Sequence, residues 1–338
     1  MGAHAGPGTG DALARRVVPC SAMATRPPTR LAYGTMLMLA AMVLLPIMDG
    51  IAKGLTLRYP VAQVVWARYL FHFAVMFPVL LARLGPRALV PKHVGSQLIR
   101  GTLLLAATVL FFFALASMPQ ATALALFFVS PLVVTMLAPA LLGERVGVWR
   151  ASAVAVGFVG VLLILRPGSE VFAWGALLAV AAGTVHGLYM LYTRKLAGTS
   201  PPLVTLAYTA VVGAVVMTGV MAFVWVPPTP RDFGAMALLG LLAAGGHFLL
   251  IKAFDHAPAT WLAPLGYTEM ITAAIVGYVQ FRHLPDAMGW LGIAIIVGAG
   301  VVISLRERRG TPALRPGGIG SQRRAETEAA APLSVEGD

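Results

Sequence analysis

Residues 121–164 read ATALALFFVSPLVVTMLAPALLGERVGVWRASAVAVGFVGVLLI, two long apolar runs joined by the charged connection Gly143-Glu144-Arg145. A helix that crosses a bilayer needs about 20 mostly apolar residues, because the hydrocarbon core is about 30 Å thick and a helix rises about 1.5 Å per residue. Runs of this kind recur along the chain, at 31–52, 61–81, 98–118, 121–142, 149–165, 172–191, 203–224, 233–251, 260–279 and 288–305. We therefore predict an all-α integral membrane protein with ten transmembrane helices.

The composition argues against other classes of protein. Hydrophobic residues make up 58% of the 338 residues and charged residues 11%, whereas soluble domains carry about 25% charged residues. The single cysteine, Cys20, allows neither an intrachain disulfide nor a cysteine-based metal site. The histidines show no metal-ligand spacing, and the chain has no phosphate-binding Gly-rich loop. We expect no cofactor, no metal and no ATP motor.

The net charge of +12 is explained by topology. If the N-terminus faces the cytoplasm, most of the 25 Lys and Arg residues fall on the inner side of the membrane. This bias follows the positive-inside rule, so the basic charge needs no nucleic-acid partner. We expect a multi-pass protein of the inner (cytoplasmic) membrane, with the lipid bilayer as its surroundings and both termini in the cytoplasm.

An internal repeat divides the chain into two halves. Residues 259–304 read ATWLAPLGYTEMITAAIVGYVQFRHLPDAMGWLGIAIIVGAGVVIS and resemble the stretch that begins at Ala121. Each copy has five spans, an odd number, so the two copies must have opposite orientations in the membrane. We predict two inverted five-helix repeats, 30–167 and 168–308, an arrangement that recurs among transporters with a substrate site between the halves.

The segments outside the repeats, 1–29 and 309–338, are rich in Gly, Ala, Pro and charged residues and have no apolar period. Segments of this composition cannot bury enough apolar surface to fold. We predict disordered tails, with Met23 as an alternative first residue to Met1.

Short motifs spread over both halves carry a family resemblance. They are Lys53, Arg68, Ser130-Pro131, Gly143-Glu144-Arg145, Gly160, Arg166-Pro167, Tyr267-Thr268-Glu269, Pro285-Asp286 and Trp290-Leu291-Gly292. Through them, residues 31–308 resemble the drug/metabolite transporter superfamily, in its EamA-type ten-helix branch. The resemblance implies a secondary transporter, not an enzyme, that moves a small organic metabolite by alternating access between the two halves. It also implies a cavity lined by spans one, three, four, six, eight and nine.

Within that branch, the stretch 118–147 is similar to importers of riboflavin or S-adenosylmethionine more than to exporters of aromatic amino acids. The chain departs from the family at Phe281-Arg282-His283, where an acidic residue is common. An amino acid or metabolite exporter of the same family is an open alternative, and so are an intramembrane enzyme and a non-transporting scaffold. The residues do not decide the direction of transport, the coupling ion or whether the chain forms a homodimer.

Ionisable residues inside a span cost about 2.5–3.5 kcal/mol each on insertion scales, so each one there needs a reason. Glu269 lies about ten residues into its span, roughly 15 Å deep, where it can bind a cation or carry a proton. Arg68 can hold a carboxylate or phosphate. His247 can relay a proton, and His186 and His72 are weaker candidates for the same role. The structural alternatives are local hydrogen bonds and, for Arg68, pairing with Asp49.

Two further pairs of residues complete the predicted site. Asp49 and Lys53 lie four residues apart on one helix face, so we expect an ion pair, although Asp49 can also titrate during transport. Tyr267 and Phe127 are predicted to line the cavity and to stack on a flat substrate. The alternative for both rings is ordinary packing. The predicted substrate-binding residues are therefore Glu269, Arg68, His247, Tyr267 and Phe127.

Prolines and glycines predict where spans break or pack closely. Pro46, Pro131 and Pro264 fall inside the first, fourth and ninth spans, and each removes one helical hydrogen bond. Breaks at matching places in two halves indicate a binding site. Small residues at a spacing of four give a smooth helix face for close packing, and in the sixth span they are Gly175, Ala179, Gly183 and Gly187. We expect the same of Gly157, Gly160, Gly298 and Gly300 in the fifth and tenth spans.

Overall fold

The computed structural model describes residues 28–86, 93–142, 147–166, 174–196 and 200–310. The predicted disordered tails, 1–29 and 309–338, lie outside the described residues except at their inner ends. Twelve helices form in the described part of the chain: α1 (Pro28–Thr56), α2 (Val61–Leu84), α3 (Val94–Ser117), α4 (Gln120–Phe127), α5 (Ser130–Leu142), α6 (Val148–Leu165), α7 (Trp174–Lys195), α8 (Pro202–Val224), α9 (Pro230–His256), α10 (Ala259–Gly266), α11 (Glu269–Phe281) and α12 (Ala287–Gly310).

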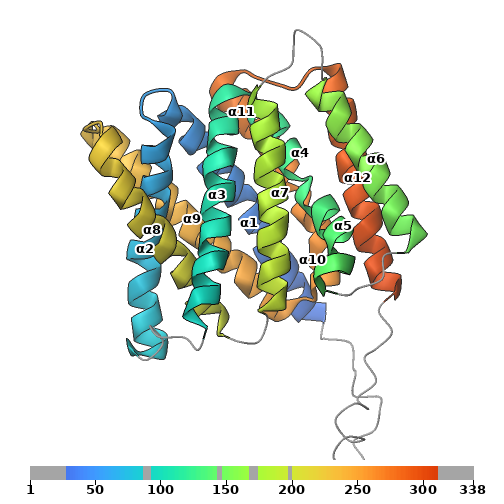
Figure 1. Ribbon diagram of the computed structural model, residues 1–338, viewed down its shortest axis with the longest axis horizontal. Coiled ribbons are helices and arrows are strands. Elements are labelled where there is room, and N and C mark those ends of the chain that lie inside the picture. The colour runs from blue at the N-terminus through green and yellow to red at the C-terminus, as the bar shows by residue number, and fades with distance from the viewer. Residues whose placement is uncertain (1–27, 87–92, 143–146, 167–173, 197–199, 311–338) are drawn as a thin grey trace, which may run out of the picture.

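These helices make ten spans, because α4 with α5 and α10 with α11 each form one interrupted span (Figure 1). Eight spans have the length and apolarity to cross a membrane, and the apolar helices Ala151–Leu165 and Ala287–Ile303 are shorter. Each span overlaps the apolar run that predicted it. The predicted all-α fold with ten spans is confirmed.

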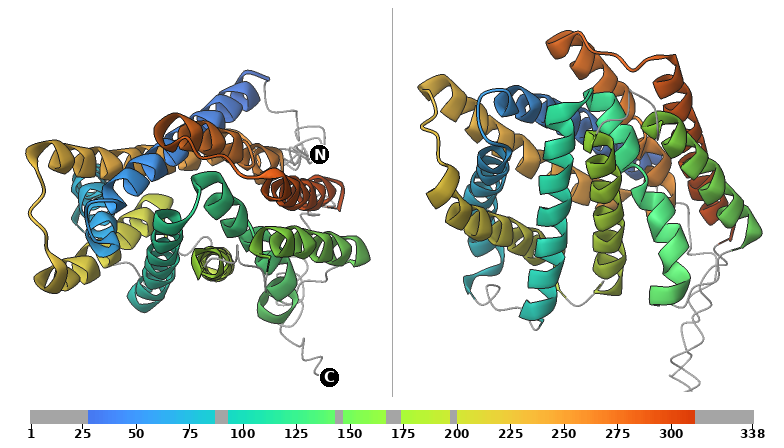
Figure 2. Two further views of the ribbon diagram at one scale, coloured as in Figure 1. Left: turned by 90° about the horizontal axis from the view of Figure 1, so that it is seen from above. Right: turned by 45° about the horizontal axis from the view of Figure 1, so that its top comes forward.

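The contacts between helices follow the internal repeat. The five spans of the first half are α1, α2, α3, α4–α5 and α6, and α7 to α12 repeat them in the same order. The most extensive helix contacts join α1 to α9, α3 to α7, α6 to α12 and α2 to α8. Exchanging the two halves turns the α1–α9 contact into the α7–α3 contact and leaves the other two unchanged. The halves are therefore related by an approximate two-fold axis, and Figure 2 shows α7 beside α3 and α12 beside α6 from above.

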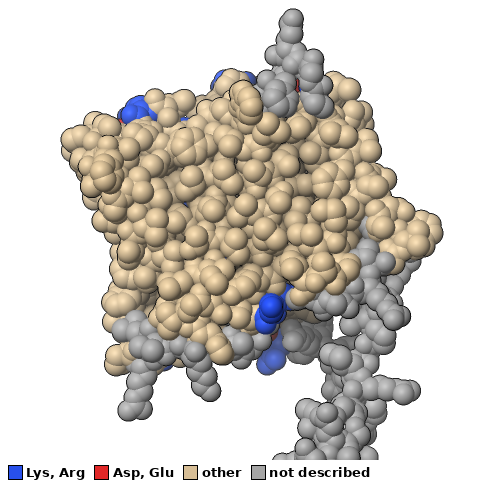
Figure 3. Space-filling view, viewed as in Figure 1, with Lys and Arg blue, Asp and Glu red and all other residues tan. Residues whose placement is uncertain are grey.

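The surface of the described residues is that of a membrane protein. Large apolar side chains are exposed on many helices, among them Phe223 at 87%, Val215 at 67% and Ile271 at 63%. Figure 3 shows Lys and Arg at the upper and lower rims and an uncharged surface between them. An apolar surface of this extent is stable against lipid and not against water.

Glycines bring α7 into direct contact with the interrupted span of the first half. A Cβ atom added to Gly183 would lie 2.5 Å from the carbonyl oxygen of Phe127, and one added to Gly187 would lie 3.0 Å from that of Ser130. The close packing predicted for these two glycines is confirmed. The same prediction is wrong for Gly298, where no atom lies within 4 Å of an added Cβ, so that glycine faces open space.

Candidate functional site

Two helix interruptions lie inside the bundle at matching places in the two halves. α4 ends at Phe127 and α5 begins at Ser130, while α10 ends at Gly266 and α11 begins at Glu269. The first turn of a helix has backbone N–H groups without helical partners and a partial positive charge. Glu269 is the first residue of α11, so its carboxyl group lies at such a helix end.

The three prolines relate differently to these interruptions. Pro131 is the second residue of α5, a position where a proline costs no helical hydrogen bond, so the predicted loss of one there is wrong. Pro264 lies in α10, two residues before its end. No break occurs at Pro46, because α1 continues through it to Thr56, and the prediction of one there is wrong. The Pro46 carbonyl instead accepts a 2.7 Å hydrogen bond from Nε2 of Gln120, which joins α1 to the start of α4.

Arg68 of α2 is buried, with 9% of its surface exposed. Its Nη1 donates a 2.7 Å hydrogen bond to the hydroxyl of Thr108, and its guanidinium lies 5.4 Å and 5.7 Å from the ring centroids of Tyr69 and Phe112. The Nε atom is buried and has no hydrogen-bond partner. Arg68 forms no ion pair within the described residues, although its charge acts on Asp49.

Two carboxyl groups, those of Asp49 and Glu269, belong to the same candidate site. Asp49 of α1 is 5% exposed and interacts electrostatically with Glu269 of α11, a helix that packs on α1. In the described part of the chain, neither carboxyl group has a hydrogen-bond or ion-pair partner. The site therefore holds two acceptor groups and one donor group that the protein itself does not match.

The predicted Asp49–Lys53 ion pair is wrong. The Lys53 ammonium group donates hydrogen bonds to the carbonyl oxygens of Leu115, at 2.8 Å, and of Met118. These are among the carbonyls at the end of α3 that have no helical donor, and a lysine near a helix C-terminus commonly bonds them. Lys53 therefore joins α1 to α3 and leaves Asp49 unpaired.

Three histidines, His72, His186 and His247, lie within electrostatic range of Arg68. The rings of His72 and His247 lie 5.7 Å apart, between α2 and α9. Nδ1 of His247 bonds the carbonyl oxygen of Ala243 at 2.8 Å, and because a carbonyl only accepts, Nδ1 carries the proton. Nε2 of His72 and Nδ1 of His186 are buried without partners. His72, a minor candidate in the sequence, therefore lies within the cluster.

A row of rings extends from the cluster along α3, α4 and α7. Phe127 lies 5.0 Å from Phe111 and 4.7 Å from His186, whose ring in turn stacks on Tyr189 at 5.5 Å. Tyr267 lies elsewhere, because its ring contacts Phe128 at 5.0 Å and its hydroxyl lies against Gly300 of α12. Its predicted role as cavity lining stays a prediction.

Arg100 of α3 is buried, with 5% of its surface exposed, near the end of α3 that lies at the bottom of Figure 1. It donates to the hydroxyls of Thr193, Thr209 and Tyr189 at 2.9, 2.8 and 2.6 Å, and to the carbonyl of Thr205 at 2.8 Å. All four acceptors belong to α7 or α8, so one side chain joins the two halves. No sequence signal pointed to it, because its partners lie far along the chain.

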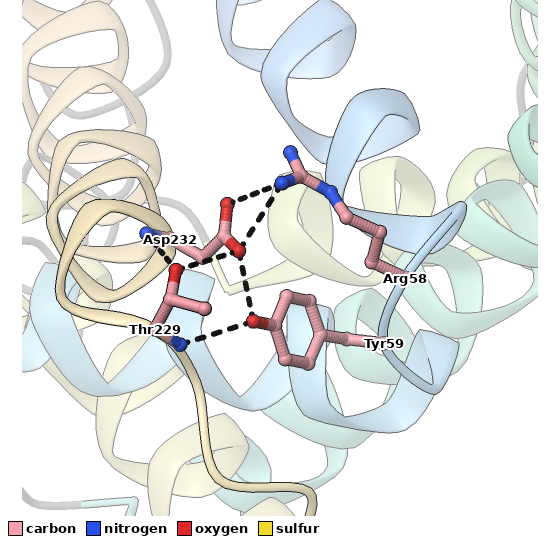
Figure 4. Close-up of polar contacts among 4 residues, drawn as sticks. All are labelled: Arg58, Tyr59, Thr229 and Asp232. Atoms are coloured by element: carbon pink, nitrogen blue, oxygen red, sulfur yellow. Dashed lines mark hydrogen bonds and ion pairs between the residues drawn. The ribbon is translucent and has the colours of Figure 1, made fainter.

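A second network joins the halves at the upper face, the end of the bundle at the top of Figure 1, and Figure 4 shows its residues. Arg58, just after α1, forms a 3.0 Å ion pair with Asp232 in the first turn of α9. The Asp232 carboxylate also accepts hydrogen bonds of 2.9 Å from the hydroxyls of Tyr59 and Thr229. The exposed Arg58 and the buried Asp232 thus connect the first and second halves at the end opposite Arg100.

A third connection at the upper face joins the loop before α12 to the end of the first half. Arg166 and Asp286 form a 2.6 Å ion pair, and the backbone N–H of Gly289 donates to Asp286 at 2.8 Å. The hydrogen bond from Arg166, followed by that from Gly289, holds the pKa of Asp286 below its ordinary value.

Two hollows lie outside the central cluster. One, of about 740 Å³, is an apolar groove between α10–α11 and α12 that includes Tyr267 and Trp290. The other, of about 320 Å³, lies at the upper face beside Lys53, Ser117 and His283. Arg68, Asp49 and Glu269 line neither of these two hollows.

Ten spans in two inverted halves, with a charged and buried site between them, define a membrane transporter. The chain belongs to the EamA-like transporter family, which matches residues 32–166 and 173–305, one match in each half. It is therefore a multi-pass membrane protein and a transporter of small metabolites, not an enzyme.

Curated relatives cover most of the chain. A riboflavin transporter of Rhizobium johnstonii is 30% identical over 285 residues, which are 83% of this chain and 94% of the relative. An S-adenosylmethionine uptake transporter of Rickettsia bellii is 30% identical over 262 residues, 77% of this chain and 89% of the relative. The pseudopaline exporter CntI of Pseudomonas aeruginosa is 28% identical over 283 residues, which are 82% of this chain and 97% of the relative.

A solved crystal structure has the same fold. It superposes with a TM-score of 0.58 at 22% sequence identity, over 82% of this chain and 98% of that one. At this identity the similarity concerns the fold alone.

Proposed function

We propose that the chain imports a small organic metabolite, of the riboflavin or S-adenosylmethionine type, across the inner (cytoplasmic) membrane, with both termini in the cytoplasm. The observation that carries this proposal is Arg68, a buried cation whose Nε–H has no hydrogen-bond partner and whose charge acts on Asp49, a carboxyl group that forms no ion pair within the described residues. A permanent structural role would be expected to pair these charges with each other, since unpaired charge inside a membrane is costly. The names of the riboflavin and S-adenosylmethionine relatives support the class of substrate.

In this proposal, Arg68, Glu269 and His247 contact the polar groups of the substrate, and Phe127 packs on its flat part. Tyr267 contacts the substrate only if the interrupted span α10–α11 moves relative to α12, because its ring now lies against Gly300. Asp49 or Glu269 carries a coupling proton, with exchange of two substrates as the alternative.

Transport proceeds by alternating access, with the first half rocking against the second. The networks around Asp232 at the upper face and Arg100 at the lower face both cross between the halves. Each network opens in turn while the other stays closed, so the central site communicates with one side at a time. The glycine contacts between α7 and the α4–α5 interruption provide a close-packed surface for this movement.

Export is the second candidate, and the pseudopaline exporter among the relatives favours it. Uptake and efflux of radiolabelled riboflavin and S-adenosylmethionine in cells that express the chain distinguish the two directions. We expect saturable uptake of one compound that falls at least tenfold in Glu269→Gln at equal membrane abundance. Efflux from preloaded cells without uptake would favour the exporter, and no flux of either compound would contradict the proposed substrate class.

A further inference from the structure

The central site contains an arginine and two carboxyl groups that form no ion pair with one another. Arg68 lies on α2, Asp49 on α1 and Glu269 on α11. The charge of Arg68 acts on Asp49 and that of Asp49 acts on Glu269, so Asp49 lies within electrostatic range of both, and α1 packs on α11. None of them forms an ion pair with another, and both carboxyl groups lack a hydrogen-bond partner among the described residues. Buried charges in proteins are otherwise paired or hydrogen-bonded.

The geometry at Arg68 leaves a donor edge available. A guanidinium has five N–H groups in a planar fork that fits a carboxylate with two parallel hydrogen bonds. Thr108 takes one bond at Nη1, and the rings of Tyr69 and Phe112 hold the plane of the group. The Nε–H is buried without an acceptor, although the side chain is only 9% exposed. A ligand carboxylate is a group that would satisfy it.

The carboxyl groups of Asp49 and Glu269 would suit a cationic partner. Ionised carboxylates only accept hydrogen bonds, and two of them in one site repel each other unless a cation or a proton lies nearby. Lys53, the basic residue closest to Asp49 along α1, bonds the end of α3 instead. Arg68 acts on Asp49 but forms no ion pair with it, and no protein cation among the described residues acts on Glu269. A cationic group of the substrate is therefore a partner that would suit the two carboxyl groups.

We propose that the substrate is a zwitterion, with a carboxylate that binds Arg68, a cationic group that faces Asp49 and Glu269, and a planar ring that packs on Phe127 and His186. This inference rests on the proposed function, since it concerns the same site, and it narrows the substrate from any small metabolite to one with an amino-acid-like charged end. A neutral flat molecule such as riboflavin would offer no carboxylate to the Arg68 Nε–H and no cation to the two carboxyl groups.

Binding to the purified full chain in lipid nanodiscs tests the carboxylate directly. The probes are S-adenosylmethionine, which has a carboxylate, a cation and a planar base, and its decarboxylated analogue, which lacks only the carboxylate. A hydrogen bond to a charged group contributes about 1.5–3 kcal/mol, so we expect the analogue to bind about 10- to 100-fold more weakly. In Arg68→Gln the two compounds should bind within about threefold of each other. Arg83→Gln, an exposed arginine at the end of the same helix, is the control that should keep the full ratio.

The comparison of the two compounds on the unaltered chain does not depend on any variant folding. Equal affinity for both would overturn the inference, and so would an Arg68→Gln variant that folds and keeps the ratio. Transport of riboflavin without binding of S-adenosylmethionine would also overturn it and would leave the proposed function standing. Transport of neither compound would contradict the proposed function and this inference with it.

Discussion

The carboxylate of Asp232 pairs with the guanidinium of Arg58 at 3.0 Å, and this contact joins the end of α1 to the first turn of α9. Arg100 makes the comparable connection at the opposite end of the bundle through α7 and α8. Each network joins one half of the chain to the other. In a transporter that alternates between two openings, the stability of each network determines how often its face opens.

Asp232→Asn should open the upper face more often. The substitution removes the ion pair with Arg58 and weakens the bonds from Tyr59 and Thr229 to a buried carboxylate, a loss of about 1–3 kcal/mol. In a Cys20→Ser background, spin labels at Leu57 and Val226, both exposed, report the separation of the two loops. Longer distances should gain population in the variant.

The control for that measurement is Asp255→Asn. Asp255 pairs with Lys252 at 3.0 Å within α9 itself, and both side chains are exposed. Removing this pair changes the charge equally but breaks no contact between the halves, so the distances should stay unchanged. Identical distance distributions in the Asp232 and Asp255 variants would argue against a gating role for the upper network.

Lys53→Met should destabilise the protein through the loss of its bonds to the end of α3, and not through the loss of a partner for Asp49. The substitution leaves the carbonyl oxygens of Leu115 and Met118 without a donor in a buried region, at a cost of about 1–3 kcal/mol. Thermal unfolding in detergent measures the loss, with Lys252→Met as the control on an exposed site. If Lys53 instead paired with Asp49, the double variant Lys53→Met/Asp49→Asn would recover the stability, and we expect no recovery.

Gly183→Ala should be destabilising where Gly245→Ala is not. Both glycines lie inside helices, where alanine is the better helix former by about 1 kcal/mol. An added Cβ at Gly183 would lie 2.5 Å from the backbone oxygen of Phe127. An added Cβ at Gly245 would have no neighbouring atom within 4 Å. Overpacking of this kind costs about 1–3 kcal/mol. Unfolding midpoints should fall for Gly183→Ala and stay level or rise for Gly245→Ala, and a rise in both would show that α7 can move away from the interruption at no cost.

The Arg166–Asp286 pair should make stability depend on pH at the acidic end. Because the pKa of Asp286 is lowered in the folded protein, its contribution is fully present above the ordinary value of 3.8. It is lost as the pH falls through the lower folded value. Asp286 is exposed, so the contribution is at most about 1 kcal/mol. The difference in unfolding midpoint between the unaltered chain and Asp286→Asn should be constant from pH 7 to 5 and shrink below pH 4. A difference that grows below pH 4 would contradict the assignment.

Local sequence patterns predicted the fold and part of the candidate site. Hydropathy located all ten spans, because a span is a property of about 20 consecutive residues. The spacing of four in the sixth span predicted the close contacts at Gly183 and Gly187, because that spacing is also a local property of the chain. Pro264 predicted the interruption before Glu269, whereas the same signal at Pro46 was wrong.

Contacts between distant segments could not be predicted in this way. The four-residue spacing of Asp49 and Lys53 allows an ion pair, but Lys53 bonds the end of α3, which only the packing of α1 against it reveals. Arg100 lies near the start of its span, where a basic residue is ordinarily exposed, and yet it is buried. Its acceptors on α7 and α8 are 89 to 109 residues away. Tyr267 lies in the predicted span, and yet its ring direction depends on Gly300 of another helix.

Counterflow in proteoliposomes tests the central claim most directly. Vesicles that contain the purified chain are loaded with unlabelled substrate and diluted into a trace of the labelled compound, with riboflavin and S-adenosylmethionine tested separately. An alternating-access transporter should accumulate label transiently above equilibrium, with saturation by external substrate, and Arg68→Gln should abolish this while Arg83→Gln does not. Label that only equilibrates, without overshoot or saturation, or an overshoot that survives in Arg68→Gln, would contradict a single alternating site at Arg68.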